Sequence, residues 1–337
     1  MLFAYRLADA RLERLRPDAP LGDAIWVDLY RPQPEQSARV LAELGVEVPT
    51  LADMEEIEIS NRFYREAGPV GAPGRAPEGG QDVMTVLLPG ALPDGAQATG
   101  PVSFILSDRR LVTVRHHAPR PFETFPARAD RSSTGCATPA RLFLGLVEEV
   151  VGRGADILEA SGRTLDAIAA RVYAGAREAL TPDELEEALR SIGREGETLA
   201  RVRLGLLSVE RMLSFFLLWS EQRPGASSEA KALRAPIKSL QRDINALEVH
   251  ADFLSGRVGL ATDTTLGMVN LSQNSSVRMM SVVAALFLPP TLIASVYGMN
   301  FAHMPELGWR LGYPLSLLAM VGSAAATWAW FKWRGWI

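Results

Sequence analysis

The spacing of apolar and polar positions changes along the chain and divides it into three kinds of segment. Up to about residue 130, short runs rich in Val, Ile and aromatic residues are separated by segments containing Gly and Pro, a pattern typical of strands in a mixed α/β region. A helix is predicted over 34–45, ending at Gly45. The predicted strands are 24–30, 83–89 and 102–116, the last turning at Ser107–Arg110 as a hairpin.

Helical spacing replaces this pattern from residue 139 onwards. One helix is predicted to begin at Thr181, with Pro182 in its first turn and Glu184 as the capping-box partner. A further helix is predicted to begin at Ser227 or Ser228, and its apolar residues alternate in steps of three and four like the seam of a coiled coil. This seam comprises Ile237, Leu240, Ile244, Leu247, Ala251, Leu254, Val258 and Ala261.

Two uncharged stretches follow, residues 279–298 and 312–331. Each would be about 30 Å long as a helix, which matches the hydrocarbon core of a bilayer. No proline lies between Pro236 and Pro289, so a single helix of about 90 Å is predicted to run from 237 to 298, out of the aqueous region and through the first span. A buried helical hairpin in a soluble protein is the alternative, but buried helices seldom run this long without charge.

Flanking residues predict the orientation of the two spans. Arg257 and Arg278 precede the first span, and Lys332 and Arg334 follow the second, which places both termini in the cytoplasm. The connecting loop carries both Arg310 and Glu306. Four tryptophans crowd the end of the second span, as at a membrane interface: Trp328, Trp330, Trp333 and Trp336.

Composition excludes several classes of function. Cys136 is the only cysteine, which rules out a disulfide within the chain and a thiolate zinc site and suits a cytosolic environment. The formal net charge is −4 and no long basic run occurs, which argues against a nucleic-acid partner. No serine–histidine–aspartate, zinc-helix or paired-carboxylate arrangement has a credible context, so an enzyme is not expected. The pair His116–His117 ends a strand and is expected to lie on the surface.

One face of the long helix is lined by small or polar residues. In steps of three and four it reads Asp263, Gly267, Asn270, Asn274, Val277, Ser281, Ala284, Leu288, Thr291, Ser295 and Gly298, whereas the opposite face of the span is bulky and apolar. Such a face turns towards other helices or water. Close helix packing would explain it as well as a pore would, and two helices per chain cannot enclose a pore without further copies.

The chemistry of this face suits a hard cation that keeps its water. Mg²⁺ dehydrates reluctantly, so amide and hydroxyl oxygens can hydrogen-bond to its hydration shell. A ring of Asn300 side chains at the outer mouth would select such an ion, and Leu288 and Val277 would form apolar constrictions that gate by dewetting.

The stretch "YGMNF", followed by "MPEL" and "GYP" between two terminal spans, closely resembles the CorA family of magnesium transporters, two-span metal-ion transporters with a Gly-x-Asn motif. Here the motif is Gly298, Met299 and Asn300. "LFLPPTLIASVYGMN" is similar to the first span of that family, and "WVDLYRP" and "LVTVRHH" more loosely resemble its N-terminal domain. The resemblance covers most of the chain and is tightest after about residue 260.

The resemblance implies a homopentamer in the bacterial inner membrane, in which Gly298–Asn300 form the selectivity filter and Glu306 lies in the outer loop. It implies Mg²⁺ both as cargo and as a regulatory ion bound at Asp263 between subunits, with Asp53, Glu55, Glu56 or Glu58 as its partner, and no ATP site. Without the resemblance, Asp263 would be an ordinary solvated helix acid. The positions expected to line the pore, from the resemblance and the helix face together, are Asn274, Val277, Met280, Ser281, Ala284, Leu288, Thr291 and Ser295.

We therefore expect a cytosolic α+β domain of mixed sheet and flanking helices, a long stalk helix and two C-terminal membrane helices. The expected segments are 1–135, the α/β domain; 136–226, a helical region; 227–278, the stalk; 279–298, the first span; 299–311, the outer loop; 312–331, the second span; and 332–337, the tail. The alternatives are a zinc transporter of the related ZntB type and a two-span anchored scaffold or sensor. The sequence does not decide the preference among Mg²⁺, Co²⁺, Ni²⁺ and Zn²⁺.

Overall fold

The computed structural model describes residues 1–56, 58, 62–66, 80–174, 180–222, 227–300 and 304–336. It contains two compact units. The first comprises Met1–Ala169 and Ser191–Ala261, and the second comprises Ala170–Arg190 and Thr262–Ile337. The boundary between them runs through three long helices.

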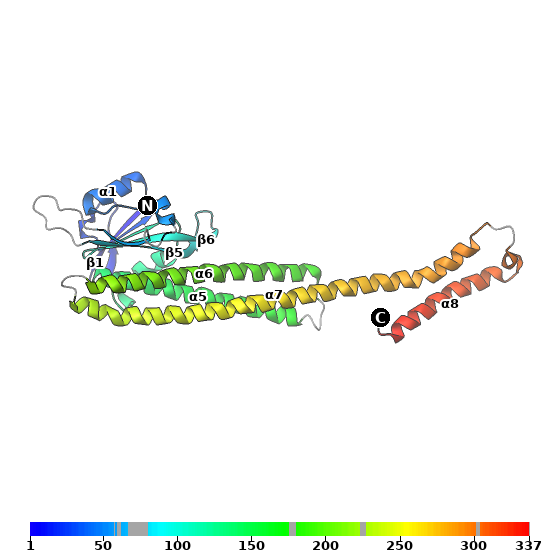
Figure 1. Ribbon diagram of the computed structural model, residues 1–337. Helices are drawn as coiled ribbons and strands as arrows, with labels where there is room; N and C mark the ends of the chain where they lie inside the picture. Colours follow the sequence, from blue (N-terminus) through cyan, green and yellow to red (C-terminus); the bar gives the residue numbers. More distant parts are fainter. Residues whose placement is uncertain are drawn as a thin grey trace, which may run out of the picture. The chain divides into compact units, whose positions relative to one another are not determined.

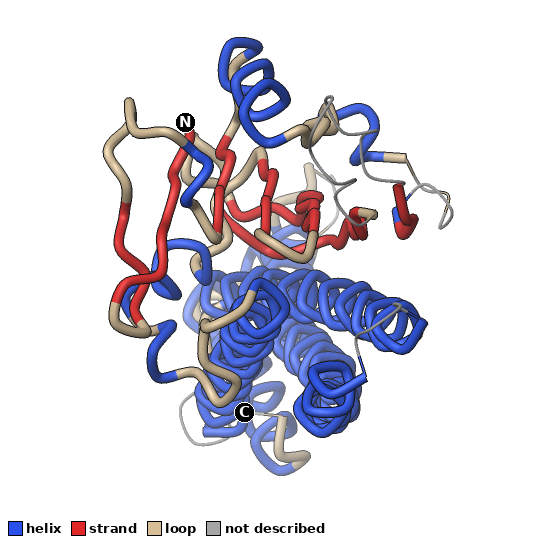
Figure 2. The backbone as a smooth tube through the Cα atoms, turned by 90° about the vertical axis from the view of Figure 1, so that its left-hand side faces the viewer, coloured by secondary structure: helices blue, strands red, loops and turns tan. Residues whose placement is uncertain are grey.

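A seven-stranded mixed sheet forms one layer of the first unit (Figure 2). Its strand order is β2 (Arg11–Arg14), β1 (Leu2–Ala8), β3 (Trp26–Tyr30), β7 (Leu111–Arg115), β6 (Gln97–Leu106), β5 (Gln81–Ala91) and β4 (Phe63–Glu66). Neighbouring strands are antiparallel except β3 and β7, which run parallel. The predicted strands 24–30, 83–89 and 102–116 are confirmed as β3, β5 and the β6–β7 hairpin, whose turn is closed by the Ser107 amide donating to the Arg110 carbonyl at 3.0 Å.

Three strands were not predicted: β1, β2 and β4. The β1–β2 hairpin turns through Asp9 and Ala10, both with positive φ (49° and 61°). That backbone is expected of the turns that join two strands in a tight hairpin. The sequence "DA" is a weaker turn signal than Asn-Gly or Asp-Gly, which explains why the pattern at the start of the chain was missed.

Period-two alternation divides the sheet into two faces, each with its own core. On one face Trp26, Phe104 and Leu111 pack with residues of three long helices, α5 (Pro139–Ala174), α6 (Pro182–Gln222) and α7 (Ser227–Tyr297). On the other face Val27 and Val112 pack against α1 (Pro34–Leu44) and α2 (Leu51–Glu55). Figure 1 shows α1 and α5–α6 on opposite sides of the sheet.

The helix boundaries follow the predicted capping residues. Thr181 and Glu184 form the capping box of α6, because the Thr181 amide donates to the Glu184 carboxylate (2.9 Å) and the Glu184 amide donates to Thr181 Oγ1 (3.3 Å). Helix α1 ends at Gly45, which has φ 70°. Helix α7 begins at Ser227, as predicted. The shorter helices are α4 (Pro121–Thr124), η1 (Leu21–Asp23), η2 (Phe125–Ala127), η3 (Ala129–Arg131) and η4 (Pro305–Gly308).

The second unit contains the C-terminal part of α7 and helix α8 (Gly312–Trp333). In the described part of the chain, α7 and α8 are the two helices long and apolar enough to cross a membrane. Their span side chains are largely exposed in the isolated chain; on α8, Phe331 is buried. The mixed sheet with flanking helices, the long helix and the two apolar C-terminal helices confirm the predicted fold class.

Candidate functional site

The residues predicted to line a pore lie on the continuous helix α7. Because its helical structure runs unbroken from Ser227 to Tyr297, the three- and four-residue spacing of the polar face does place these side chains along one side. All positions of that face from Asp263 to Gly298 are exposed in the single chain. Met280 immediately precedes Ser281, so it lies about 100° around the helix and flanks the face.

Hydroxyl groups on this face donate their protons to their own helix. Thr291 Oγ1 donates to the Phe287 carbonyl (2.7 Å), and Ser281 Oγ donates to the Val277 carbonyl (2.9 Å). A hydroxyl that has placed its proton in this way offers its remaining lone pairs as acceptors. The water molecules around a cation point their hydrogens outwards, so these oxygens have the right polarity to accept from a hydrated cation.

The candidate motif follows directly on the end of α7. The Gly298 amide donates to the Ala294 carbonyl (2.9 Å) and the Met299 amide to the Val296 carbonyl (3.3 Å), so the last turn tightens before the chain leaves the helix. A Cβ at position 298 would lie 3.1 Å from the Ala294 carbonyl, a close approach that favours glycine. Asn300, the next residue after this turn, is exposed at the helix end.

The loop between α7 and α8 contains η4, and the backbone of Glu306 lies in this 3₁₀ turn. The side chain of Glu306 lies outside the described part of the structure. Helix α8 then begins at Gly312, where the Leu315 amide donates to the Leu311 carbonyl (3.0 Å). The predicted role of Glu306 therefore stays a prediction.

Sequence reasoning missed a second apolar seam on α7, within the first unit. Val249, Phe253 and Leu260 are 71%, 61% and 62% exposed, although neighbouring positions such as Ala251 are fully buried. Residues two positions apart on a helix point about 200° away from each other. Phe253 therefore lies on the side opposite Ala251 and the core. The spacing of four and seven residues between Val249, Phe253 and Leu260 marks one helix face in the sequence, but it does not show whether that face is buried or exposed.

This exposed seam and the polar face follow one seven-residue spacing. Starting at Phe253, steps of seven lead through Leu260 and Gly267 to Asn274. Further steps of seven reach Ser281, Leu288 and Ser295. A strict seven-residue repeat keeps one helix face towards a common axis when several helices wrap around each other with a left-handed supercoil. Such a repeat is typical of a helix face along which several helices pack.

The predicted regulatory carboxylates belong to different elements, with Asp263 on α7 and the other candidates in and after α2. In the described ranges, no group of three or more His, Cys, Asp or Glu side chains could hold a metal ion. Asp263 is exposed on α7, and Glu55, Glu56 and Glu58 are exposed near α2. Asp53 caps α2 by accepting from the Thr50 hydroxyl (2.7 Å) and amide (2.8 Å), and these bonds hold the pKa of its carboxyl below the usual range. A metal site at Asp263 thus remains a prediction that depends on ligands from outside one chain.

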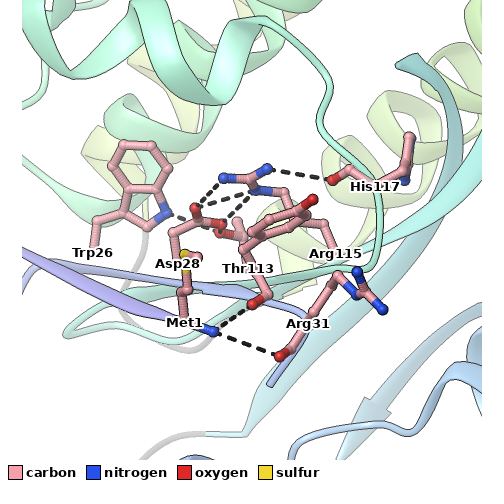
Figure 3. Close-up of polar contacts among 8 residues, drawn as sticks. Met1, Trp26, Asp28, Arg31, Thr113, Arg115 and His117 are labelled. Carbon is pink, nitrogen blue, oxygen red and sulfur yellow. Dashed lines mark hydrogen bonds and ion pairs between the residues drawn. The ribbon is translucent and has the colours of Figure 1, made fainter. Parts of the chain in front are cut away.

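The stretches "WVDLY" and "LVTVR", which resemble the N-terminal domain of the family, contribute to a buried polar cluster (Figure 3). Arg115 binds both carboxylate oxygens of Asp28, with its terminal nitrogen 2.9 Å from Oδ2. Thr113 Oγ1 donates to Asp28 (2.8 Å) and accepts from the Trp26 indole (3.0 Å). The Met1 amine donates to the Tyr30 carbonyl at 2.5 Å. These contacts join β1, β3 and β7, so the conspicuous residues of "WVDLY" and "LVTVR" hold the sheet together.

The expectation that His116 and His117 form a surface pair is wrong, because His117 is 2% exposed. Its ring lies between Gly90 and Gly100 of the paired strands β5 and β6, where a Cβ on either glycine would come within 2.7 Å of the imidazole. His117 Nε2 lies 2.8 Å from the Leu88 carbonyl, whereas Nδ1 is buried without a partner among the described residues. Burial holds the pKa of His117 below its ordinary value. Gly90 and Gly100 together form a slot for the ring. The pattern within one strand could not reveal this slot, because the two glycines lie on different strands.

Comparisons with known proteins agree with this architecture. The model of the family described as "CorA-like Mg2+ transporter protein" matches residues 22–333. The magnesium transport protein CorA of Escherichia coli K12 is 31% identical over the full length of both chains, and that of Salmonella typhimurium LT2 is 32% identical over the same extent. The solved structure of the CorA magnesium transporter from Methanocaldococcus jannaschii is 17% identical and superposes with a TM-score of 0.69, covering 100% of this chain and 99% of that one. The chain therefore belongs to the CorA-like Mg²⁺ transporter family.

Proposed function

We propose that this protein is a membrane channel that carries Mg²⁺ into the cytoplasm down its electrochemical gradient. The observation that carries this proposal is the seven-residue spacing on α7, which joins an exposed apolar seam in the first unit to a face of amide and hydroxyl oxygens in the first span. The curated relatives, named as magnesium transport proteins, support Mg²⁺ as the cargo.

Several copies are needed to enclose a pathway, because each chain contributes two spans. Val249, Phe253 and Leu260 are large apolar side chains left exposed along one helix in the single chain, and burial against another copy would remove them from water. Since α7 continues from this seam into the span, copies that meet at Phe253 would turn Asn274, Ser281 and Ser295 towards the shared axis. A closed ring of identical chains satisfies this geometry, and the family resemblance makes that ring a homopentamer.

Selectivity in this proposal arises from acceptors for water. The pore-lining set is Asn274, Val277, Met280, Ser281, Ala284, Leu288, Thr291 and Ser295, and Asn300 forms a ring of amides at the outer mouth together with Gly298 and Met299. The Thr291 and Ser281 hydroxyls give their protons to the helix, so their oxygens accept from the hydration shell of the ion. An ion that exchanges its inner water slowly, as Mg²⁺ does, passes with that water in place.

The membrane potential supplies the driving force at about 2.3 kcal/mol per charge per 100 mV, which is doubled for a divalent ion. We place the protein in the bacterial inner membrane with both termini in the cytoplasm, and assign 279–298 and 312–331 as the spans and 299–311 as the outer loop. Residues 1–135 form the α/β domain and 136–226 the helical region; 227–278 form the stalk and 332–337 the tail. Transport of this kind needs no ATP and no chemical step.

Ion flux into proteoliposomes tests the proposal. Wild-type protein should admit Mg²⁺ when a negative internal potential is applied. Asn300→Ala should reduce the flux by about tenfold or more, because each copy loses an amide that bonds to the hydrated ion. Asn245→Ala, at an exposed asparagine of α7 in the first unit, is the matched control and should leave the flux unchanged.

The assembly of each variant should be checked by its mass in detergent. Absence of flux in the wild type would favour the scaffold or sensor alternative. Repeating the measurement with Co²⁺, Ni²⁺ and Zn²⁺ separates a magnesium channel from a zinc transporter of the ZntB type, since the latter would prefer Zn²⁺.

We further propose that cytosolic Mg²⁺ bound at Asp263 between copies stabilises the closed ring, with a partner from Asp53, Glu55, Glu56 or Glu58. Loss of the ion would leave carboxylates repelling one another and loosen the ring, which is feedback through different metal affinities of two states. Asp263→Ala should then weaken the protection from proteolysis that Mg²⁺ provides to the wild type. Asp243→Ala, at an exposed acid of the same helix, should keep that protection, and equal protection in both variants would contradict the regulatory role.

A further inference from the structure

A polar cavity of about 530 Å³ lies in the first unit, beside the N-terminal half of α5. It is lined by Arg120, Pro121, Thr124, Arg128, Arg131, Ser132, Gly145, Glu148, Glu149, Gly152, Arg153 and Asp156. The four arginines come from the loop before α4, the short helical turns that follow it, and α5. Its volume falls in the range of small-molecule sites.

The acidic residues of the cavity are largely engaged by neighbouring groups. Glu148 accepts from the Ser133 amide (3.0 Å) and hydroxyl (2.9 Å). Glu149 accepts from the Thr124 hydroxyl at 2.8 Å and from Arg128 at 3.3 Å. These bonds anchor the loop after α4 to α5, and they leave less capacity for the carboxylates to bind the other arginines.

The remaining guanidinium groups are weakly paired. The nearest Arg153–Asp156 approach is 3.9 Å, with Asp156 69% exposed, so solvent screens this pair. The Arg120 and Arg131 side chains form no ion pair or hydrogen bond with any residue that the structure describes. Three arginines therefore face a concave space with their donors available to a ligand.

The lining also shows what kind of ligand fits. It includes no Leu, Ile, Val, Met or aromatic residue. Protein–protein contacts depend on buried aromatic and aliphatic anchors, and nucleobases stack on aromatic rings; neither is provided here. Guanidinium groups bind phosphate oxygens in bidentate fashion. The cavity, at about 530 Å³, is also large for a single phosphate. Its arginines come from several elements and can therefore contact more than one phosphate group.

We propose that this cavity binds a condensed phosphate, either free diphosphate or the phosphate tail of a nucleotide, through Arg120, Arg131 and Arg153. The site is separate from the polar face of α7 and does not depend on the transport proposal. Because it recognises phosphate oxygens rather than a base, the same arginines serve both sources of the ligand.

Gly152 offers a way to block the cavity without disturbing the fold. It lies within α5 and lines the cavity, and a Cβ built on it would meet no heavy atom within 4 Å. Gly193 in α6 is equally unobstructed and lies outside the cavity lining, so it provides a matched control.

The test is isothermal titration calorimetry of the purified full-length protein with sodium diphosphate in buffer free of divalent ions. We expect saturable binding near one diphosphate per chain. The double variant Arg120→Gln/Arg131→Gln and the single variant Gly152→Glu should each weaken binding by about tenfold or more, because bidentate phosphate contacts are lost or a like charge is added. Gly193→Glu should bind as the wild type does.

The proposal would be overturned by the absence of saturable binding, or by unchanged binding in Arg120→Gln/Arg131→Gln or in Gly152→Glu. Equal weakening in Gly193→Glu would also overturn it, because that would indicate attraction by net charge alone. ADP and adenosine separate the possible sources. ADP should compete with diphosphate and adenosine should not; competition by adenosine would show recognition of the nucleoside and contradict a phosphate site. Thermal unfolding of each variant verifies that the fold is intact.

Discussion

Apolar side chains form a buried core in the first unit but are largely exposed on the membrane-crossing part of α7. Phe143 of α5 is fully buried in the core beneath the sheet, whereas Phe287 of α7 is 62% exposed. The first unit completes its core within one chain. The span residues cannot do so, because a single pair of helices has too little surface to cover itself, so their remaining contacts have to come from outside the pair.

Polar groups also differ between these regions, because the cluster around Asp28 in the first unit is paired within the chain and the hydroxyls on the span face outwards. In the first unit, Asp28 and Arg115 are buried and satisfy each other through three hydrogen bonds. On α7, the Thr291 and Ser281 hydroxyls donate to carbonyls of their own helix and present acceptors outwards. Groups paired inside the chain stabilise the fold, whereas outward-facing acceptors can bind a group outside the helix, which is the use that the proposed function gives them.

The largest expected effect sharpens the comparison of the two phenylalanines. Phe143→Ala should reduce the stability of the first unit by about 3–5 kcal/mol, since it removes a buried ring and leaves a cavity. Phe287→Ala should change the same stability by less than about 1 kcal/mol, because Phe287 belongs to the second unit and its side chain is exposed in the single chain. Hydrogen–deuterium exchange at the amides of β6, in full-length protein, measures both. Similar losses in the two variants would mean that the first unit does not hold its own core.

A smaller effect is expected at the exposed seam, where the proposed assembly would bring copies into contact. Phe253→Asp should weaken association by about 1.5–3 kcal/mol per chain, the value of burying one such side chain, and shift the mass measured by light scattering towards smaller species. Leu41→Asp, at a leucine of α1 that is 53% exposed, is the control and should leave the mass unchanged. An intact assembly in Phe253→Asp would refute the seam as the contact between copies.

The smallest effect concerns pH and the slot occupied by His117. Burial holds the pKa of His117 below the value near 6.5 that it regains on unfolding, so the unfolded state binds more protons between those two pKa values. Stability of the first unit should be complete above about pH 6.5 and should fall as pH drops from there towards the folded pKa. The charges of Arg115 and His116 also lower the pKa of His117.

His117→Gln keeps a donor for the Leu88 carbonyl and should reduce this dependence, as measured by thermal unfolding of the full-length protein from about pH 8 to pH 5. A remainder of the same sign should persist, because burial also lowers the pKa of His116. His250→Gln, on the exposed surface of α7, is the control and should retain it. The pKa values of Asp53 and Glu43 are lowered, so protonation of these carboxylates reduces stability only at more acidic pH. They therefore do not obscure the pH range in which His117 titrates. A pH dependence unchanged in His117→Gln would exclude the slot as its cause.

Much of the architecture was determined by the sequence alone, because local periodicity and capping chemistry act within a few residues. The start of α6 at the Thr181–Glu184 capping box, the continuity of α7 and the two uncharged spans all follow from neighbours along the chain. The "YGMNF" stretch, read with its position between the spans, also predicted the family that the comparisons confirm.

Only the tertiary structure decided which side chains meet across the fold. His117 appeared to belong to the surface until Gly90 and Gly100, distant in sequence, were seen to form its slot. The cavity beside α5 depends on Glu148 and Glu149 being engaged by a loop more than ten residues away. Phe253 fits a helical pattern as well as Ala251 does, and its exposure became evident only when the core on the opposite side of α7 was complete. Periodicity defines the faces of a helix, but long-range packing decides which face is left for a partner.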